Sequence, residues 1–193
     1  MRQLVEGLRE IIGSAEGRAM DLATIGQIEA QVRASLPRME KSCLCTREYA
    51  PGRYLCYKDA DLGFVVMFFV WGPGNGTAIH DHGTWGVEAV LKNALKITNY
   101  SACEKNPQPT ESFVAEQGCI MHNLPPERDV HKVEHHSGGR AMSLHVYGKE
   151  MSGNRSFFPG EGFKVCKLEC RELTTEFDFT DMTKSCRAAL GTS

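Results

Sequence analysis

The sequence predicts a mainly β protein, an antiparallel jelly-roll β-barrel with helices packed outside. From Arg53 onward, β-branched and aromatic residues dominate short segments that Gly, Pro, Asn and Asp separate, which is typical of successive strands. The segment Leu62–Trp71 is apolar on both faces, so both faces must be covered, as in a sandwich or barrel. A helical stretch precedes the strands instead of alternating with them, which favours a barrel over βαβ units.

The helical stretch covers residues 2–35. Apolar residues recur there every three to four positions in two groups, and Asp21 stands before the second group as a candidate N-cap, so two amphipathic helices are expected. The pattern changes near Pro37. The expected strands are Arg53–Tyr57, Leu62–Trp71, Thr77–Asp81, Val87–Leu91, Leu95–Tyr100, Ser112–Ala115, Val130–Glu134, Ala141–Tyr147 and Phe163–Cys170.

The composition describes a soluble chain of balanced charge. The 193 residues include 22 Lys and Arg against 24 Asp and Glu, without a dense basic patch, so neither a nucleic acid nor a membrane is an expected partner. The first residues carry charges every few positions and no secretory or membrane-spanning run, so a cytoplasmic location is expected. The eight cysteines form no Cys-x-x-Cys pair, which predicts reduced thiols.

The length predicts one domain over residues 1–193, because chains usually divide into separate cores only above roughly 250 residues. Within it we expect a helical N-terminal segment (1–40), a β-barrel core (49–170) and a C-terminal extension (171–193). The sequence does not indicate the oligomeric state.

The most informative stretch is residues 74–91, where His80 and His82 are separated by one residue. On a strand these two positions share a face while Asp81 points the other way, so both imidazoles enter one space and could chelate one metal ion. A His-x-His pair taken alone is better explained as a coincidence of the core or surface. Two further features favour the metal site.

The first feature is a polar row on the segment Ala141–Tyr147. Ser143, His145 and Tyr147 alternate with apolar residues, so a hydroxyl, an imidazole and a phenol share one strand face. If this face is buried, the row lines a cavity or is satisfied by mutual hydrogen bonds. Periodicity also fits the opposite arrangement, in which the polar row faces water and the apolar residues fill the core.

The second feature is His131, on an expected strand after the Pro125-Pro126 turn, which could supply a third imidazole from across the barrel. Three imidazole nitrogens suit Fe(II), but zinc and copper also accept them, so this ligand set does not identify the metal. The remaining histidines are weaker candidates. His122 precedes a loop, and His135 and His136 stand beside Ser137-Gly138-Gly139, an expected exposed turn.

These motifs resemble a known family. The run from Gly74 through His82 is similar to the first motif of the cupin superfamily, and its combination with His131 and with Ser143 to Tyr147 resembles the cysteine dioxygenase family of thiol dioxygenases, over roughly residues 49–158. The resemblance implies that His80, His82 and His131 hold Fe(II). It also implies that Ser143, His145 and Tyr147 form a hydrogen-bonded row ending in a phenol beside the substrate.

Two positions depart from the family. The animal enzymes carry a cysteine, crosslinked to the active-site tyrosine, where alignment through Val90 and Leu91 places Gly86, so no crosslink is expected. The usual cupin glutamate would be a fourth ligand, and Glu88 lies near that position but is shifted. We therefore expect Glu88 not to bind the metal.

The resemblance implies that the substrates are a small thiol carboxylate and O2. Arg53 matches an arginine that binds the carboxylate in cysteine-specific members, and Arg155 lies near the corresponding arginine of members that prefer 3-mercaptopropionate. An arginine fork suits a carboxylate, although either residue could be a solvated surface charge. L-cysteine, oxidised to cysteine sulfinic acid, is the first expectation and 3-mercaptopropionate the alternative. A non-oxidising metal-dependent cupin isomerase or lyase and a small-ligand-binding cupin remain open.

Overall fold

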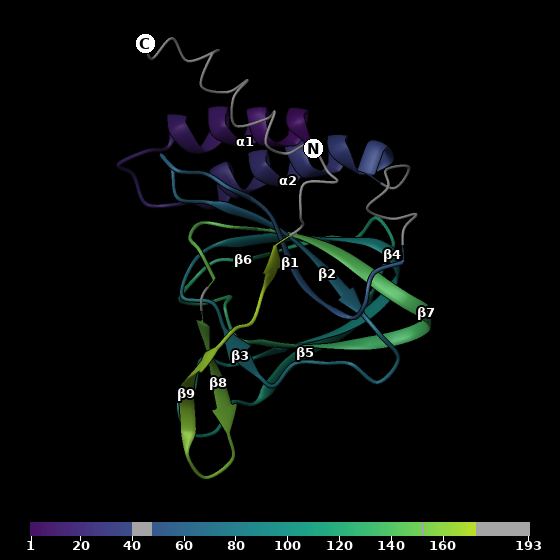
Figure 1. Ribbon diagram of the computed structural model, residues 1–193. Coiled ribbons are helices and arrows are strands. Elements are labelled where there is room, and N and C mark those ends of the chain that lie inside the picture. The colour runs from purple at the N-terminus through teal and green to yellow at the C-terminus, as the bar shows by residue number, and fades with distance from the viewer. Residues whose placement is uncertain (40–47, 152, 173–193) are drawn as a thin grey trace.

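The computed structural model describes residues 1–39, 48–151 and 153–172. It is mainly β, with two N-terminal helices lying over a curled sheet (Figure 1). The expected barrel with external helices is therefore confirmed. The elements in these residues are α1 (Arg2–Ser14), α2 (Leu22–Met39), β1 (Gly52–Lys58), β2 (Val65–Trp71), β3 (His80–Asp81), β4 (Gly86–Tyr100), β5 (Pro109–Glu116), β6 (Ile120–Asn123), β7 (His131–Tyr147), β8 (Gly153–Phe158), β9 (Gly162–Lys167) and β10 (Arg171–Glu172).

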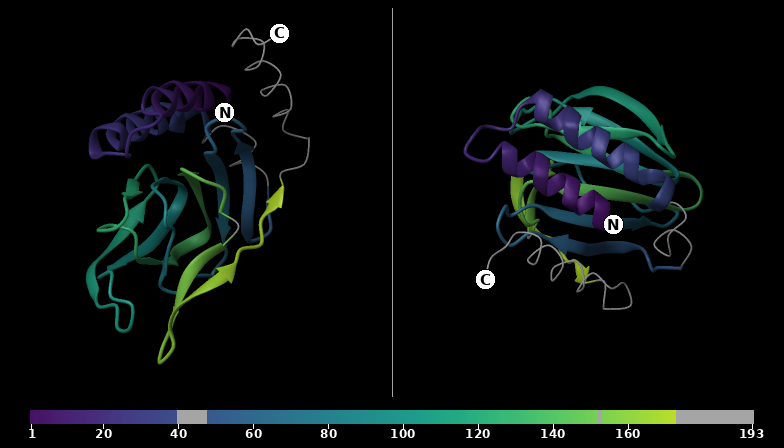
Figure 2. Two further views of the ribbon diagram at one scale, coloured as in Figure 1. Left: turned by 90° about the vertical axis from the view of Figure 1, so that its left-hand side faces the viewer. Right: turned by 90° about the horizontal axis from the view of Figure 1, so that it is seen from above.

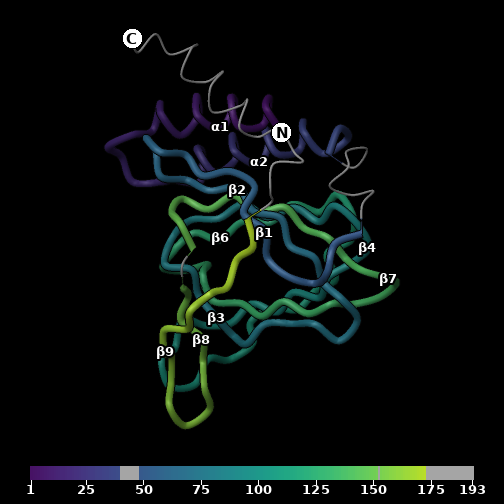
Figure 3. Tube along the Cα trace, viewed as in Figure 1, coloured from purple at the N-terminus to yellow at the C-terminus, as the bar shows by residue number. Residues whose placement is uncertain are grey.

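The sheet has two halves that share the long strands β4 and β7. In the half nearer the helices, pairing runs β10-β1-β2-β7-β4-β6 and uses residues 141–147 of β7. In the other half it runs β9-β8-β3-β7-β4-β5 and uses residues 131–137 of β7. Figure 2 shows the sheet curling so that the two halves face each other. All of these pairs are antiparallel except that of β10 with β1, a segment that Figure 3 shows crossing from the β8–β9 hairpin.

The two long strands bend where they pass between the halves. The pairing of β4 with β7 shifts register around Lys92 and Ala94, and Asn93 and Gly138 both have positive φ, 58° and 78°. The Asn93 side chain donates a 2.8 Å hydrogen bond to the carbonyl of Arg140. Residues 137–139 are exposed, as expected, but the turn predicted there is wrong. Glycine permits the left-handed conformation, so the strand bends at Gly138 and continues.

Other boundaries also differ from the sequence prediction. The expected strands Val87–Leu91 and Leu95–Tyr100 form one strand, β4, and Thr77–Asp81 reduces to the two residues of β3. The strands β6 and β8 were not predicted, because Met121, His122 and Arg155 interrupt any clear alternation. The expected C-terminal extension contributes β10, and its residues 173–193 lie outside the described part of the chain.

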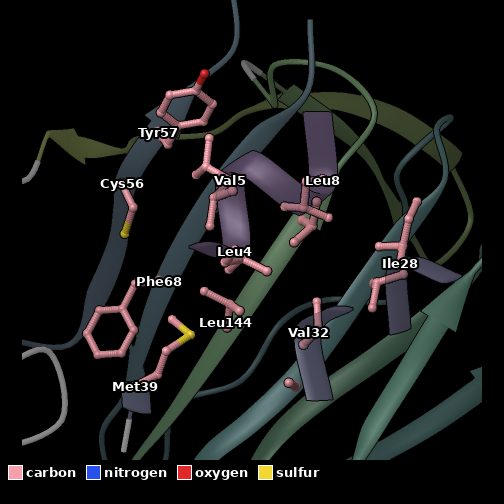
Figure 4. Packing of buried hydrophobic residues seen from close by; sticks show 14 of the residues in the cluster. Leu4, Val5, Leu8, Ile28, Val32, Met39, Cys56, Tyr57, Phe68 and Leu144 are labelled. Carbon is pink, nitrogen blue, oxygen red and sulfur yellow. The ribbon is translucent and has the colours of Figure 1, made fainter. Parts of the chain in front are cut away.

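The helices begin and pack as their pattern predicts. Asp21 caps α2, since its Oδ1 accepts a 2.8 Å hydrogen bond from the Thr24 amide, although the helix continues through Pro37 to Met39. One apolar cluster joins both helices to the outer face of β2 and β7 (Figure 4). It contains Leu4, Leu8, Ile28, Val32, Phe68 and Leu144, all fully buried.

A second apolar cluster lies inside the barrel and includes Val65, Met67, Val90 and Val133. Every residue of β2 is buried, so the prediction that this segment is covered on both faces is confirmed. Among the described helices, none is long and apolar enough to cross a membrane. The cysteines described, including the buried Cys56, are free thiols, whereas Cys43, Cys45 and Cys186 lie outside the described residues.

Candidate metal centre and its pocket

The inner face of the sheet carries the polar row. Strand pairing aligns His145 with Met67 on one side and Glu88 on the other, and aligns Tyr147 with Gly86. Met142, Leu144 and Val146 point the other way, into the cluster beneath the helices. Both faces of residues 141–147 of β7 are thus buried. The apolar residues fill a core, as the alternative arrangement supposed, while the polar row faces the barrel interior instead of water.

The three predicted ligand histidines come together in this interior. His80 pairs directly with His131 across β3 and β7, and all three are buried. Their ring centroids lie 4.7 Å (His80–His131), 4.9 Å (His80–His82) and 4.9 Å (His82–His131) apart. One nitrogen from each ring lies within 4.8 Å of those of the other two, so three nitrogen atoms converge on one point.

Hydrogen bonds fix the orientation of two of these rings. The Nδ1 of His80 lies 3.0 Å from the carbonyl oxygen of Ala78, and the Nδ1 of His82 lies 3.0 Å from Oδ1 of Asp129. Asp129 also accepts hydrogen bonds from the amides of His82 and Gly83. With Nδ1 as donor in both rings, Nε2 keeps its lone pair free for a metal, as is usual for metal-ligating histidines.

Burial keeps the imidazoles of His80 and His131 neutral. It lowers the pKa of His131 to about 4, since the nearby carboxylate of Glu88 only partly offsets it. Burial and the neighbouring rings of His131 and His82 lower the pKa of His80 well below its usual value. Neutral imidazole is the metal-binding form, so the described residues fit a divalent metal ion of the kind that accepts nitrogen ligands.

The polar row forms one directional chain of hydrogen bonds. Trp71 Nε1 donates to Ser143 Oγ at 2.9 Å, and Ser143 Oγ lies 2.7 Å from His145 Nε2. His145 Nδ1 lies 2.9 Å from the Tyr147 hydroxyl, which donates to Oε1 of Glu88 at 2.9 Å. Because Tyr147 gives its proton to Glu88, His145 donates from Nδ1 and Nε2 accepts from Ser143.

The chain ends on a buried carboxylate. Glu88 is 3% exposed and also accepts a 3.2 Å hydrogen bond from Asn123. Burial raises the pKa of Glu88, but the interaction with His145, both electrostatic and through a hydrogen bond, is the main effect that outweighs it and leaves that pKa well below its usual range. Burial and the Glu88 charge raise the pKa of Tyr147 well above 10. Tyr147 is therefore a protonated phenol.

Gly86 lies directly against the phenol ring. A Cβ built there would stand 2.8 Å from both Cδ1 and Cε1 of Tyr147, closer than carbon atoms approach. Glycine thus lets the ring occupy its position. Since Gly86 has no sulfur, a thioether with the tyrosine cannot form at this position.

The two candidate arginines lie in different places. Arg53 lines the cavity that contains the three histidines, with its guanidinium 5.6 Å from the centre of the Phe69 ring, and Phe69 stacks on His145. Arg155 does not line this cavity. Its Nη2 pairs with Asp81 at 2.5 Å and its Nη1 with Glu104 at 2.8 Å, so its fork is already occupied by carboxylates.

The cavity is small, with a volume of about 20 Å³, roughly the space that one water molecule needs. A shallower groove of about 220 Å³ adjoins it and shares Arg53, Phe69 and Trp71, so Arg53 lines both the cavity and the groove. The cavity lining also contains residues that sequence reasoning missed, because their contribution depends on strand pairing: Phe69, Trp71, Thr77, Val133, Met151, Asn154 and Leu168. Asp129 was also missed, although it precedes His131 by two residues.

A curled antiparallel sheet with three convergent histidines in its interior defines a barrel protein with a candidate metal centre. The cysteine dioxygenase type I family matches residues 53–158, more than half of the chain. The protein belongs to this family, as its motifs suggested.

Solved structures that match the chain are distant. An oxalate oxidase in complex with glycolate is 15% identical, with a TM-score of 0.42, and the match covers 53% of each chain. A cupin superfamily protein from Desulfitobacterium hafniense is 12% identical over 54% of this chain and 82% of that one, with a TM-score of 0.39. The oxalate decarboxylase of Bacillus subtilis is 16% identical over 56% of this chain and 29% of that one, with a TM-score of 0.43. The matched part of the oxalate oxidase is about half of its length.

Proposed function

We propose that the protein is an iron-dependent thiol dioxygenase that oxidises a small thiol carboxylate with O2, L-cysteine being the first candidate substrate. The observation that carries this proposal is that His80, His82 and His131 share one cavity with Arg53 and Tyr147. Membership of the cysteine dioxygenase type I family supports it. The alternative substrate is 3-mercaptopropionate or another thiol carboxylate.

The residues that would hold a metal ion are the three imidazoles of His80, His82 and His131. The chemistry that Fe(II) would supply there is Lewis acidity, which favours the thiolate form of a small thiol, and reactivity toward O2. Asp129 would keep the ring of His82 directed at the metal, since hydrogen-bonded partners of metal ligands generally fix the ligand orientation. Three nitrogen donors also accept other divalent metals, so metal analysis belongs with any activity measurement.

Arg53 would hold the substrate carboxylate. Arg53 lines both the cavity and the adjoining groove. A short thiol held there by its carboxylate would direct its sulfur toward the histidines, which is the positioning contribution to catalysis. Stacking of Arg53 on Phe69, and of Phe69 on His145, gives the guanidinium a rigid base. Arg155 is a poorer candidate because Asp81 and Glu104 occupy its fork.

Tyr147 would orient the reacting groups through a hydroxyl that is itself held in place. In the structure this hydroxyl accepts from His145 and donates to Glu88. Its second lone pair remains able to accept a hydrogen bond from the substrate. To donate a proton toward the metal side, it would have to rotate away from Glu88.

The deciding experiment is oxygen uptake by the iron-loaded protein across a panel of small thiols, with the sulfinic acid product identified by mass. We expect one O2 consumed per sulfinate formed, and loss of both metal and uptake in His131→Ala. Tight binding of a small molecule without oxygen uptake would instead indicate a ligand-binding protein. Turnover of a sugar or keto acid with another metal would indicate an isomerase or lyase.

The role of Arg53 is tested with two thiols. Loss of a charge-assisted pair typically costs a few kcal/mol, so Arg53→Ala should lower kcat/KM for a thiol carboxylate by roughly a hundredfold. Cysteamine has no carboxylate and should be affected far less. An equal loss with both thiols would mean that the arginine supports the structure and does not bind substrate.

A further inference from the structure

One side chain of the cavity wall has an unused hydrogen-bonding atom. Among the described residues, Oδ1 of Asn154 is buried and has no hydrogen-bond partner, and Asn154 lines the cavity that holds the three histidines. Buried polar atoms are paired in the large majority of cases, and an unpaired one costs roughly 1–3 kcal/mol. Its position at the cavity suggests that a ligand supplies the missing donor.

The backbone places Asn154 beside the metal centre. In the pairing of β3 with β8, His80 lies opposite Ser156 and Asp81 opposite Arg155. Continuing this register by one residue brings Asn154 opposite His82. Because neighbouring residues on a strand point to opposite faces, Asn154 faces the cavity and Arg155 faces away from it.

Arg155, which faces away from the cavity, holds β8 in position against β3. The guanidinium of Arg155 binds Asp81, the residue between the two ligand histidines, through Nε at 2.8 Å and Nη2 at 2.5 Å. The backbone amide of Arg155 also donates to Asp81. This clamp fixes β8 against β3, and with it the position of Asn154 relative to His82.

The polar residues of the cavity wall suit a ligand with two different polar groups. Arg53 is a donor and suits a carboxylate, whereas Oδ1 of Asn154 is an acceptor and needs an N–H or O–H group. The carboxylate of Glu88 lines the same cavity and favours a ligand with positive charge. A small thiol that carries both a carboxylate and an amino group satisfies all three residues.

We propose that Asn154 determines specificity by accepting a hydrogen bond from the amino group of the substrate, so that the preferred substrates are amino thiol carboxylates. This inference rests on the proposed thiol dioxygenase function. It predicts that Asn154 distinguishes L-cysteine from 3-mercaptopropionate, which has the same thiol and carboxylate but lacks the amino group. Neither thiol depends on Asn154 for its contact with Arg53.

The test compares these two thiols in two variants. Asn154→Leu removes both polar atoms at nearly constant size, and Asn154→Asp keeps an acceptor. Asn154→Leu should lower kcat/KM for L-cysteine roughly tenfold to a hundredfold and leave that for 3-mercaptopropionate within about threefold. Asn154→Asp should retain the preference for L-cysteine. The same change at an exposed site, Asn106→Leu, should alter neither thiol.

Calorimetric titration of the iron-loaded protein with each thiol in the absence of O2 provides a second readout. We expect the Kd for L-cysteine to rise in Asn154→Leu by about the same factor as kcat/KM falls, with the Kd for 3-mercaptopropionate unchanged. Equal losses for both thiols, or none, would overturn the role of Asn154 while leaving the dioxygenase proposal standing. Absence of oxygen uptake in the wild type with every thiol would overturn the proposed function itself, and the titrations would still decide whether Asn154 distinguishes the two thiols.

Discussion

Residues that do not bind the metal themselves can fix the orientation of the ligand histidines, and Asp129 is an example. Asp129 accepts hydrogen bonds from the ring of His82 and from two backbone amides. We predict that Asp129→Asn weakens metal binding tenfold to a hundredfold, the range usual for such partners, because the amide is a weaker acceptor and frees the ring to turn. Competition with a metal chelator measures the metal affinity of the variant and of the wild type. An unchanged metal affinity would show that Asp129 only orders the backbone.

The phenol of Tyr147 makes a separate contribution. Tyr147→Phe removes the hydroxyl between His145 and Glu88 without touching a histidine ligand, so we expect the metal content to stay the same. Turnover should fall ten- to a thousandfold, the size usual for one positioned hydrogen bond or proton donor. Normal turnover with full metal loading would mean that the ring serves packing alone.

Strand pairing brings residues together that are far apart in the sequence, and Gly86 on β4 shows how close the pairing is. A Cβ there would lie 2.8 Å from two ring atoms of Tyr147, so Gly86→Ala should push the ring off Glu88. We predict a stability cost of about 1–3 kcal/mol, as for overpacking, together with the turnover defect of Tyr147→Phe. Urea denaturation and oxygen uptake measure the two effects.

The matched control is Gly26→Ala on α2, where no atom lies within 4 Å of the added methyl group. That change should stabilise the helix by roughly 0.5–1 kcal/mol and leave turnover unchanged. Full activity in Gly86→Ala would show that the phenol tolerates displacement.

Spacing along single strands explains which residues of the site could be predicted from the sequence. Alternate residues of a strand point to the same face. The sequence alone therefore predicted that His80 shares a face with His82, and Ser143 with Tyr147. Asn154 and Asp129 carry no such signal, because their positions depend on which strands pair and in what register. The continuity of β7 through Gly138 was also hidden, since a glycine pair indicates a bend and a turn equally well.

For the whole molecule, the junction between α1 and the barrel depends on one buried carboxylate. Asp59 accepts hydrogen bonds from the Tyr57 hydroxyl and the amides of Asp61 and Leu62, and it pairs with Arg9 of α1. Burial raises the pKa of Asp59, but these hydrogen bonds and Arg9 outweigh it and leave that pKa below its usual value.

A lowered folded-state pKa stabilises the protein above the unfolded pKa, about 3.9, and this stabilisation is lost as pH falls through the folded value. We therefore predict that Asp59→Asn lowers the free energy of unfolding at pH 7 and flattens its decline below about pH 4, as urea denaturation across pH would show. The side chain of Asp61 is 72% exposed, so Asp61→Asn should keep the wild-type dependence of unfolding free energy on pH. Parallel profiles for wild type and Asp59→Asn would contradict the prediction.

The position of the two tryptophans gives the molecule a built-in optical probe. Trp71 forms part of the cavity wall and donates to Ser143, and Trp85 packs against Gly148, the residue after Tyr147. The chain contains only these two indoles, so half of its tryptophans lie in the wall of the metal cavity, while Trp85 packs against the apolar cluster beneath the helices. Metal loading and thiol entry can therefore be followed by the emission of the unlabelled protein, in real time and without turnover.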